Sequence, residues 1–408
     1  MGLSTLRTPN RPGLLNRLAL PLIRKLRTSY EEYQRETLSL PSFSLALPDG
    51  AEYAFGRREP IFRVKVHDQQ TLVALTSLDE TRFCEAYMAG TLDVEGEFGA
   101  IFDLRPLLSD THPLQSVWFK VLHPLLLGQI ASDKKWIAEH YDEEADFFLQ
   151  FLDRRRCYSH GLFEHDHQSL EEAIENKLSF ALHSVGAKAG QKVLDIGSGW
   201  GTMVEYGAEN GLEVTSLTIS EASRAYVAEQ IAKKGWPCKI IHQHFLEYQN
   251  SERFDAILNL GVTEHLPDYR ATLKQYQTLL KPGGRVYLDA CGARRKFPFS
   301  SFIYRYIFPG NASPLCLHEY LAEVARTPFE VVAVYNDRSS YELTCRHWAE
   351  RLEANRNDII RRWGKSLFRR FQLYLWGCVD VFQRGECEAY RLVLELPDRP
   401  VRKKRWTA

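Results

Sequence analysis

The 408-residue chain has no excess of either charge, because 52 lysines and arginines are balanced by 52 aspartates and glutamates. Domains that bind nucleic acid usually carry a net positive charge, so the balance argues against a nucleic-acid partner. The eight cysteines lack the paired spacing of a zinc site, and Cys84 and Cys157 stand far from the others. The sequence therefore predicts a protein of the reducing cytosol with neither a metal centre nor a disulfide framework.

Long apolar runs are also missing. Residues 14–26 are apolar, but Arg17, Pro21 and Arg24 interrupt them and no small-residue cleavage site follows, which argues against a membrane span and a signal peptide. Positive charge gathers at the two ends instead, with six cations and no acid in residues 1–30 and four cations in residues 402–405. Such ends predict contact with a membrane surface of anionic lipid, and hence a cytoplasmic protein that is peripheral at the inner membrane face.

The amino-terminal third is predicted to be a small α+β domain. β-branched residues cluster between turn signals in residues 43–75, notably in residues 61–66 and 71–74, which predicts several short strands. Residues 76–89 carry apolar side chains at helical spacing and predict a helix that Gly90 ends. Residues 103–151 are rich in Leu, Trp and Phe with few turn signals, and predict a helical connection.

An alternation of strands and helices begins at Gln191. The segment QKVLDIGSGWG combines an apolar strand with a glycine-rich turn, and a helical pattern follows over residues 202–209. Further apolar runs, separated by helical patterns, lie at residues 213–217, 239–241, 256–260 and 285–288. This order predicts an α/β fold with a doubly wound, mostly parallel sheet of the Rossmann-like kind, without internal repeats.

The glycine-rich turn predicts a ligand site. Gly197, Gly199 and Gly201 let the backbone turn sharply and approach a ligand at the carboxyl end of a strand, where open parallel sheets bind their ligands. Asp195 can accept a hydrogen bond there or balance a cationic ligand. A dinucleotide site is the alternative, but the spacing Gly-x-Gly-x-Gly departs from its fingerprint and the next strand ends in LTIS without an acid for the ribose.

With this turn, the chain resembles the cyclopropane fatty acid synthase family, which includes the mycolic acid methyltransferases. The motifs span residues 140–394 and are, in order, HYD, DFFLQFLD, YSHGLF, LEEAIENK, VLDIGSGWG, LTIS, VTEHL, YRYIFPG and YLWGCVDVFQRGECEAYRLVL. The resemblance implies a class I methyltransferase that uses S-adenosylmethionine. A weaker likeness, in CEAYMAGTLDVEG, relates the amino-terminal third to the lipid-associating domain of longer members. The predicted divisions are a basic segment (1–35), the lipid-associating domain (36–105), the helical connection (106–150), the methyltransferase domain (151–396) and a basic tail (397–408).

The resemblance also implies a set of cofactor-binding residues. It assigns the methionine part of S-adenosylmethionine to Tyr158 and Ser159, with Gly197 and Gly199 supporting it. It assigns the adenosine part to Thr218, Ile219, Ser220, Ser223, Gln243, His244 and Phe245. Ser223 replaces a glutamine that is usual in the family, and His244 replaces a residue that is often acidic or small, so the adenine contacts are expected to differ. The simpler interpretation of Tyr158 and Phe245 is that they are core aromatics.

Catalysis in the family uses a bound bicarbonate ion as the base, held by groups that match His160, Glu264, Asp289, Cys291 and Tyr341. His160 stands where the family has cysteine, and Asp289 where it has histidine, which puts bicarbonate binding in doubt. An ionised Asp289 beside Glu264 would repel an anion and raise the pKa of one carboxyl. We therefore hypothesise that Asp289 orients the imidazole of His160 as the base, or that Asp289 takes the proton itself. The alternative is that both residues simply pair with their neighbours.

Two further residues have opposing interpretations. Cys378 matches a cysteine considered catalytic in the family, but direct methyl transfer needs no covalent intermediate, so a small buried hydrophobe is the alternative. His265 is interpreted as a structural hydrogen-bonding residue rather than a base.

The resemblance implies methylation of a carbon in unsaturated acyl chains of membrane phospholipids, giving cyclopropane fatty acids. The aromatic residues of segment 297–308 fit this reaction, because rings stabilise a carbocation and line a tunnel for the chain, although an ordinary core is the alternative. If the proton leaves a neighbouring carbon, the product is a methylene- or methyl-branched acid, which a separate reductase completes. Methylation of another lipid or a small metabolite, a non-enzymatic lipid-binding module, and a homodimer all stay open.

Overall fold

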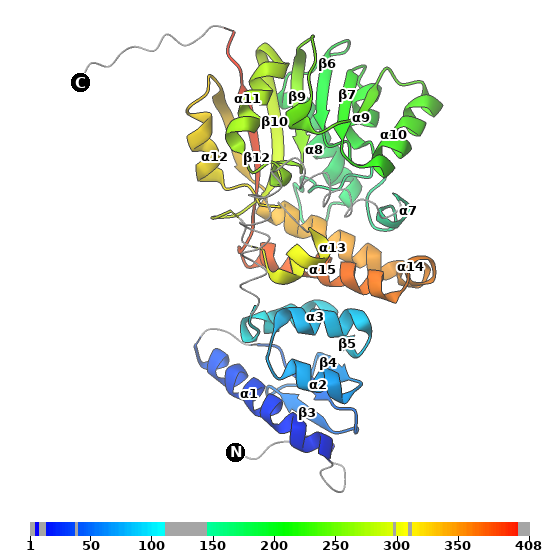
Figure 1. The fold of residues 1–408 in the computed structure, drawn as a ribbon, viewed down its shortest axis with the longest axis vertical. Coiled ribbons are helices and arrows are strands. Elements are labelled where there is room, and N and C mark those ends of the chain that lie inside the picture. Colours follow the sequence, from blue (N-terminus) through cyan, green and yellow to red (C-terminus); the bar gives the residue numbers. More distant parts are fainter. Residues whose placement is uncertain are drawn as a thin grey trace, which may run out of the picture. The chain divides into compact units, whose positions relative to one another are not determined.

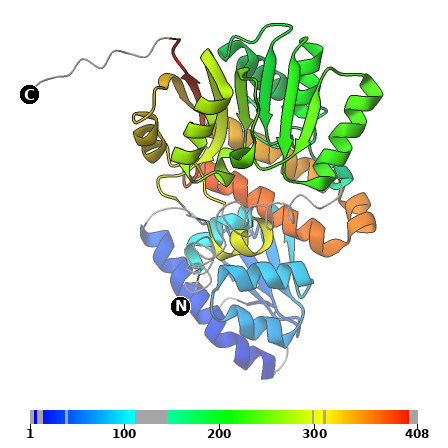
Figure 2. The same cartoon turned by 45° about the horizontal axis from the view of Figure 1, so that its top comes forward.

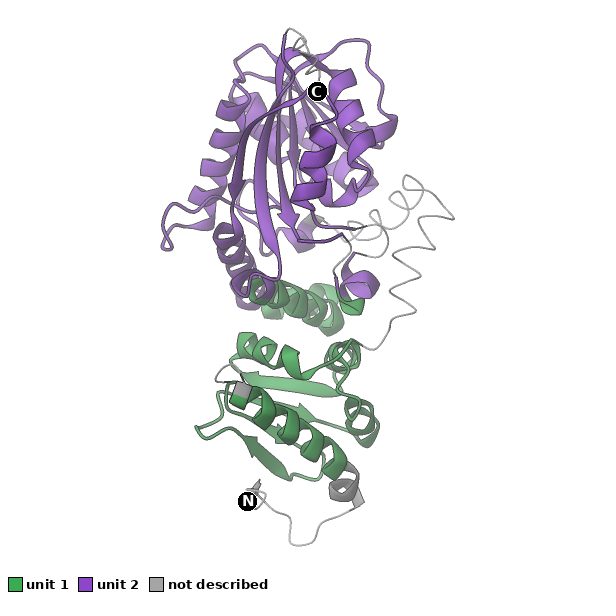
Figure 3. Cartoon of the chain, turned by 90° about the vertical axis from the view of Figure 1, so that its left-hand side faces the viewer, with its two compact units in different colours: residues 1–116, 300–302, 356–380 green, residues 117–299, 303–355, 381–408 purple. Residues whose placement is uncertain are grey.

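The computed structural model describes residues 5–7, 14–36, 40–110, 145–296, 299–308 and 312–398. The chain divides into two compact units. Unit 1 contains Met1–Ser116, Ser300–Phe302 and Arg356–Asp380, and unit 2 contains Val117–Phe299, Ile303–Asn355 and Val381–Ala408 (Figure 3). Residues 356–380, which fall within the predicted methyltransferase domain (151–396), belong to unit 1. The predicted domain bounds stay a prediction. Most of the connection predicted at residues 106–150, and the tail from residue 399, lie outside the described residues.

Unit 1 is built on a five-stranded sheet, so the predicted α+β character is confirmed. Its strands are β1 (Thr5–Arg7), β2 (Phe43–Ala46), β3 (Glu52–Phe55), β4 (Phe62–Val66) and β5 (Leu92–Gly96), in the order β1-β3-β2-β4-β5. Its helices are α1 (Leu14–Glu36), α2 (Gln69–Leu75), α3 (Glu80–Ala89), η1 (Phe98–Leu107), α14 (Arg356–Trp363) and most of α15 (Lys365–Gln383). Alternate residues of β4 are buried, and Phe62 stacks on Phe43 with ring centroids 5.4 Å apart.

The strand predicted at residues 71–74 is wrong, because these residues lie in α2. The Asp68 carboxylate accepts a hydrogen bond from the Thr71 backbone N–H at 2.7 Å and so caps the helix. Leu72 and Leu75 then lie about one helical turn apart, on the same face of α2, and both are buried. The helix predicted at residues 76–89 is confirmed as α3, which begins later, at a second aspartate cap, and ends at Gly90 with φ of 79°.

The basic amino-terminal segment is not a separate element. Residues 14–36 form α1, whose Leu22, Ile23 and Leu26 are buried in unit 1. Two of its cations are used within the same unit: Lys25 donates to the Ser77 carbonyl at 3.2 Å, and Arg27 donates to the Ala54 carbonyl at 3.2 Å.

Helix α15 belongs to unit 1 because a buried arginine ties it to α3 and β5. Arg369, only 2% exposed, donates to the carbonyl of Tyr87 at 2.6 Å and to that of Leu92 at 3.1 Å, and it pairs with Asp93. Its guanidinium also lies over the Tyr87 ring, 4.4 Å from the centroid.

We expect Arg369→Met to lower the free energy of unfolding by about 3 kcal/mol, because it removes these charge-assisted hydrogen bonds from a buried site. Equilibrium denaturation in urea measures the change. The matched control is Arg361→Met, which removes an arginine whose side chain is 73% exposed and which should change stability little. Equal effects of the two variants would contradict this account of α15.

Unit 2 holds a seven-stranded sheet in the order β11-β12-β10-β9-β6-β7-β8. Its strands are β6 (Lys192–Ile196), β7 (Glu213–Thr218), β8 (Lys239–His242), β9 (Phe254–Leu260), β10 (Leu280–Gly292), β11 (Glu330–Asn336) and β12 (Glu388–Glu395). Only β12 runs antiparallel to its neighbours, which are β10 and β11. The predicted mostly parallel, doubly wound sheet is confirmed, including all five predicted apolar strands.

Helices lie on both faces of this sheet (Figures 1 and 2). They are α7 (Ala145–Phe148), α8 (Leu170–Ser184), α9 (Thr202–Glu209), α10 (Glu221–Lys234), η3 (Phe245–Glu247), η4 (Thr263–His265), α11 (Tyr269–Leu279), the π-helix η5 (Ile303–Ile307), α12 (Leu317–Val324) and α13 (Arg338–Ala354). Helix α9 has the predicted bounds. In the part of the chain that is described, none of the helices is long and apolar enough to cross a membrane.

Candidate active site

The glycine-rich turn joins β6 to α9 and shapes the site. Gly197, Gly199 and Gly201 have φ of 77°, 49° and 85°, a region that other residues rarely adopt. The N–H groups of Gly197 and Ser198 both donate to the Leu217 carbonyl, at 2.9 and 2.8 Å, which fixes the turn against β7. A Cβ atom on Gly197 would lie 2.3 Å from the Val262 side chain. Only glycine therefore allows the backbone to lie this close to Val262.

A pocket opens at this turn, at the carboxyl ends of β6, β7 and β9. Every predicted cofactor-binding residue except Gly201 lines it: Tyr158, Ser159, Asp195, Gly197, Gly199, Thr218, Ile219, Ser220, Ser223, Gln243, His244 and Phe245. Gly201 is instead the amino-terminal cap of α9, with space for a Cβ limited by Val227 at 3.2 Å. Its part is to shape the backbone rather than to line the pocket.

The pocket-lining residues at the end of strand β9 and just after it were not predicted from the sequence. Leu260, Gly261 and Val262, at the end of β9, line it together with His265 and Leu266. The signal was present, because β9 was predicted as a parallel strand and the carboxyl ends of parallel strands meet at one edge of a sheet.

Polar side chains of the pocket hold one another in place. Ser223 Oγ donates to the Gly199 carbonyl at 2.6 Å and lies 2.8 Å from Ser198 Oγ, so the serine that departs from the family pattern supports the glycine turn. Asp195 accepts a hydrogen bond from Ser216 Oγ at 2.6 Å, and burial raises the pKa of its carboxyl to about 7. His244 Nδ1 accepts from the Leu246 N–H at 3.2 Å.

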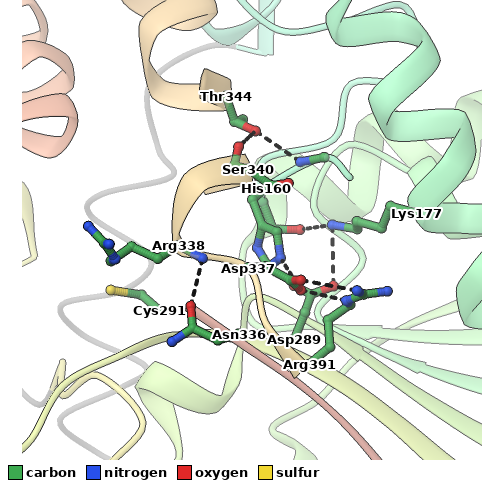
Figure 4. Close-up of polar contacts among 12 residues, drawn as sticks. His160, Lys177, Asp289, Cys291, Asn336, Asp337, Arg338, Ser340, Thr344 and Arg391 are labelled. Atoms are coloured by element: carbon green, nitrogen blue, oxygen red, sulfur yellow. Dashed lines mark hydrogen bonds and ion pairs between the residues drawn. The ribbon is translucent and has the colours of Figure 1, made fainter. Parts of the chain in front are cut away.

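Beside the pocket, a lysine that sequence reasoning overlooked makes a buried ion pair. Lys177 on α8 and Asp289 on β10 are both fully buried, and Lys177 Nζ lies 3.3 Å from Asp289 Oδ2 (Figure 4). The ammonium also donates to Ser159 Oγ and to Cys157 Sγ, the latter at 3.4 Å. Burial by itself lowers the pKa of Lys177, but Asp289 and Cys157 together outweigh it, so the pKa is raised and the ammonium is kept charged.

The hypothesis that Asp289 orients His160 is wrong. His160 Nε2 lies 3.2 Å from Oδ2 of Asp337, which stands just before α13, and Arg391 on β12 pairs with the same carboxylate, with Nη2 3.0 Å from Oδ1 (Figure 4). Asp289 is instead paired with the ammonium of Lys177, so His160 has a different carboxylate partner from the one expected from the sequence. Tyr341 covers this pair: its ring lies 4.8 Å from the imidazole and stacks on Phe382 at 4.5 Å.

Glu264 and Asp289 each keep one carboxylate oxygen without a hydrogen-bond partner among the described residues, but Asp289 is paired with Lys177. Glu264 Oε1 accepts from the Cys291 N–H at 2.6 Å, whereas Glu264 Oε2 is the buried oxygen without such a partner in the described part of the chain. Burial, chiefly, and the nearby charge of Asp289 raise the pKa of Glu264 to about 7, and the contribution of Asp289 is the one that the sequence predicted for two neighbouring carboxyls. Glu264 lies in η4, between the pocket-lining residues Val262 and His265.

The remaining candidates for catalytic residues belong to different units of the chain. Cys378 lies on α15 in unit 1, whereas His160, Glu264, Asp289 and Tyr341 belong to unit 2. His265 lines the pocket, and burial lowers its pKa to about 4, which makes it neutral at pH 7. Of the aromatic segment, Phe308 lies beside it, with ring centroids 5.8 Å apart, while Phe297 is outside the described residues.

Comparison with known proteins assigns the chain to a family. The profile of mycolic acid cyclopropane synthetases matches residues 129–392, and a domain of unknown function matches residues 30–106. The chain belongs to the mycolic acid cyclopropane synthetase family. It is accordingly an S-adenosylmethionine-dependent methyltransferase with a class I fold, and the glycine turn with its pocket fits that cofactor.

Individual members of the family and their relatives differ in the lipid they are named for. The sphingolipid C9-methyltransferase of Komagataella phaffii is 26% identical over 81% of this chain and 73% of its own length. A probable fatty acid methyltransferase of Pseudomonas putida is 26% identical over 89% of this chain and 93% of its own length. Among solved structures, the mycolic acid cyclopropane synthase CmaA1 complexed with SAH and CTAB is 27% identical, with a TM-score of 0.59 over 64% of this chain and 97% of that one.

Proposed function

We propose that this methyltransferase adds a methyl group to an alkene carbon in an acyl chain of a membrane phospholipid and releases a cyclopropane fatty acid. The observation that carries the proposal is a cofactor pocket together with the buried carboxylate of Glu264, which lies in the chain between two pocket-lining residues and has one oxygen without a hydrogen-bond partner among the described residues. The names of the relatives support a lipid substrate, because they include mycolic acid, fatty acid and sphingolipid enzymes.

Bound S-adenosylmethionine supplies an electrophilic methyl group on a sulfonium. The chain's own residues account for the other requirements. Tyr158 lines the pocket and packs against Phe148 and Trp348, with ring centroids 5.2 and 5.4 Å away, so aromatic faces are available to stabilise positive charge. The surrounding side chains are largely buried, which keeps water from a reactive carbocation.

A second candidate is methylation that ends in a branched chain, as the names of the sphingolipid C9-methyltransferases suggest. The two routes share the methyl transfer and differ in which carbon loses the proton. In the branched route a separate reductase would act on the product.

Mass spectrometry of membrane lipids tests the proposal. Cells that express the chain are fed methionine with an isotopically labelled methyl group, and their phospholipids and sphingolipids are separated before analysis. Labelled phospholipid chains that fragment as cyclopropanes are expected. Label only in sphingolipids, or only in branched chains, would select the second candidate, and no labelled lipid from folded, cofactor-binding protein would refute both.

A further inference from the structure

The charges around Glu264 are already balanced without a bound anion. Asp289 is paired with Lys177, and Asp337 is paired with Arg391 and His160. Lys177 therefore has one carboxylate and Arg391 shares a second one with His160, whereas no salt bridge joins Glu264 to a cation among the described residues. Burying a further unpaired charge would be costly, because a buried ion needs a partner and hydrogen bonds.

Bicarbonate does not fit this arrangement. The Cys291 N–H, one of the groups that the resemblance assigns to the anion, donates to Glu264 Oε1. The position that usually carries a histidine carries Asp289, whose negative charge would face the ion. Among the groups that the resemblance assigns to the anion, His160 Nδ1 is the imidazole atom that the described residues leave without a partner, and one donor does not offset two carboxylates.

We propose that Glu264 itself, through its free Oε2, accepts the proton at the end of the reaction, and that the fixed Lys177–Asp289 pair makes bound bicarbonate unnecessary. This inference rests on the proposed function. It replaces the earlier hypothesis for His160 and Asp289, since His160 Nε2 lies against Asp337 and Asp289 is the counter-ion of the buried Lys177 ammonium.

The chemical step balances with these groups. The π electrons of the alkene form the new bond to the methyl carbon, while the electrons of the carbon–sulfur bond stay on sulfur, which leaves S-adenosylhomocysteine and a carbocation. The transferred methyl group then loses a proton to Glu264 Oε2, and its C–H electrons close the three-membered ring. The protonated Glu264 returns its proton to solvent between turnovers.

The groups that face Glu264 set the pH at which it works. Asp289 on β10 raises its pKa and Lys177 on α8 lowers it, while the Cys291 N–H stabilises the carboxylate. The neighbouring His265 is neutral near pH 7, and Tyr269 on α11 stays protonated because burial, chiefly, and the charge of Glu264 among others raise its pKa. Only the ionised carboxylate accepts a proton, so the rate should rise with pH through about 7 and level off above it.

The first experiment measures bicarbonate dependence of the unaltered chain. Vesicles of phosphatidylglycerol with two oleoyl chains and labelled S-adenosylmethionine are incubated with the protein in buffer stripped of carbon dioxide, with and without added bicarbonate. The two rates are expected to agree within about twofold. A rate that bicarbonate raises by about tenfold would overturn the inference while upholding the proposed function, and no labelled product in either buffer would overturn both.

The second experiment uses the pH profile. Asp289→Asn removes the charge that raises the pKa of Glu264 and leaves the ammonium that lowers it, so the midpoint of the profile should move to lower pH. Glu264→Gln should lose product about 1000-fold while binding S-adenosylhomocysteine as before, whereas Glu252→Gln, an exposed control, should match the original chain. A Glu264→Gln variant with more than about a tenth of the activity would refute the role of Glu264.

Discussion

Lys177→Met is expected to lower the free energy of unfolding by about 3 to 5 kcal/mol, because it leaves the fully buried Asp289 carboxylate without its cation. The ammonium also holds Ser159 and Cys157, so their side chains lose a donor at the same time. Equilibrium denaturation in urea measures the effect.

Replacing both partners distinguishes the ion pair from simple packing. In the double variant Lys177→Met with Asp289→Leu, neither charge of this buried pair remains, so most of the stability should return. The methyltransferase activity should not return. The matched control is Lys192→Met, which breaks the exposed Lys192–Glu252 pair and should change stability little. A double variant as unstable as Lys177→Met alone would show that the lysine acts through packing.

Gly197→Ala is expected to weaken binding of S-adenosylhomocysteine by about 100-fold, because a displacement of the site on the scale of 1 Å has effects of that size. The new Cβ would lie 2.3 Å from the Val262 side chain, and φ of 77° already disfavours alanine. The turn must therefore shift at the point where β6 meets the pocket. Isothermal titration calorimetry measures the affinity.

The control for this variant is Gly186→Ala. Gly186 has φ of 67°, close to that of Gly197, but a Cβ there would meet no atom within 4 Å and the residue is exposed. It carries the same backbone strain without the clash, so its affinity should match the original chain. Equal losses in the two variants would show that strain alone decides the result.

Local signals predicted unit 2 well and unit 1 in part. Buried parallel strands such as β6 and β9 are continuous apolar runs that the sequence shows directly. The glycines that follow β6 mark a turn, which is also a local signal. The strand expected at residues 71–74 failed because the cap at Asp68 and the spacing of Leu72 and Leu75 outweigh the β-branched composition. The sequence did not indicate that residues 356–380 belong to unit 1, because the contacts of Arg369 join residues 276 or more positions apart in the chain.

The sequence by itself determined the fold class, the family resemblance and much of the lining of the cofactor pocket, because strands, turns and motifs are local patterns. Tertiary structure alone decided the partners of the buried charges. Lys177 meets Asp289, and His160 meets Asp337 across 177 positions of the chain, and no local pattern specifies such pairs. The physical reason is that burial makes each charge dependent on whichever partner the packed sheet and helices bring within reach.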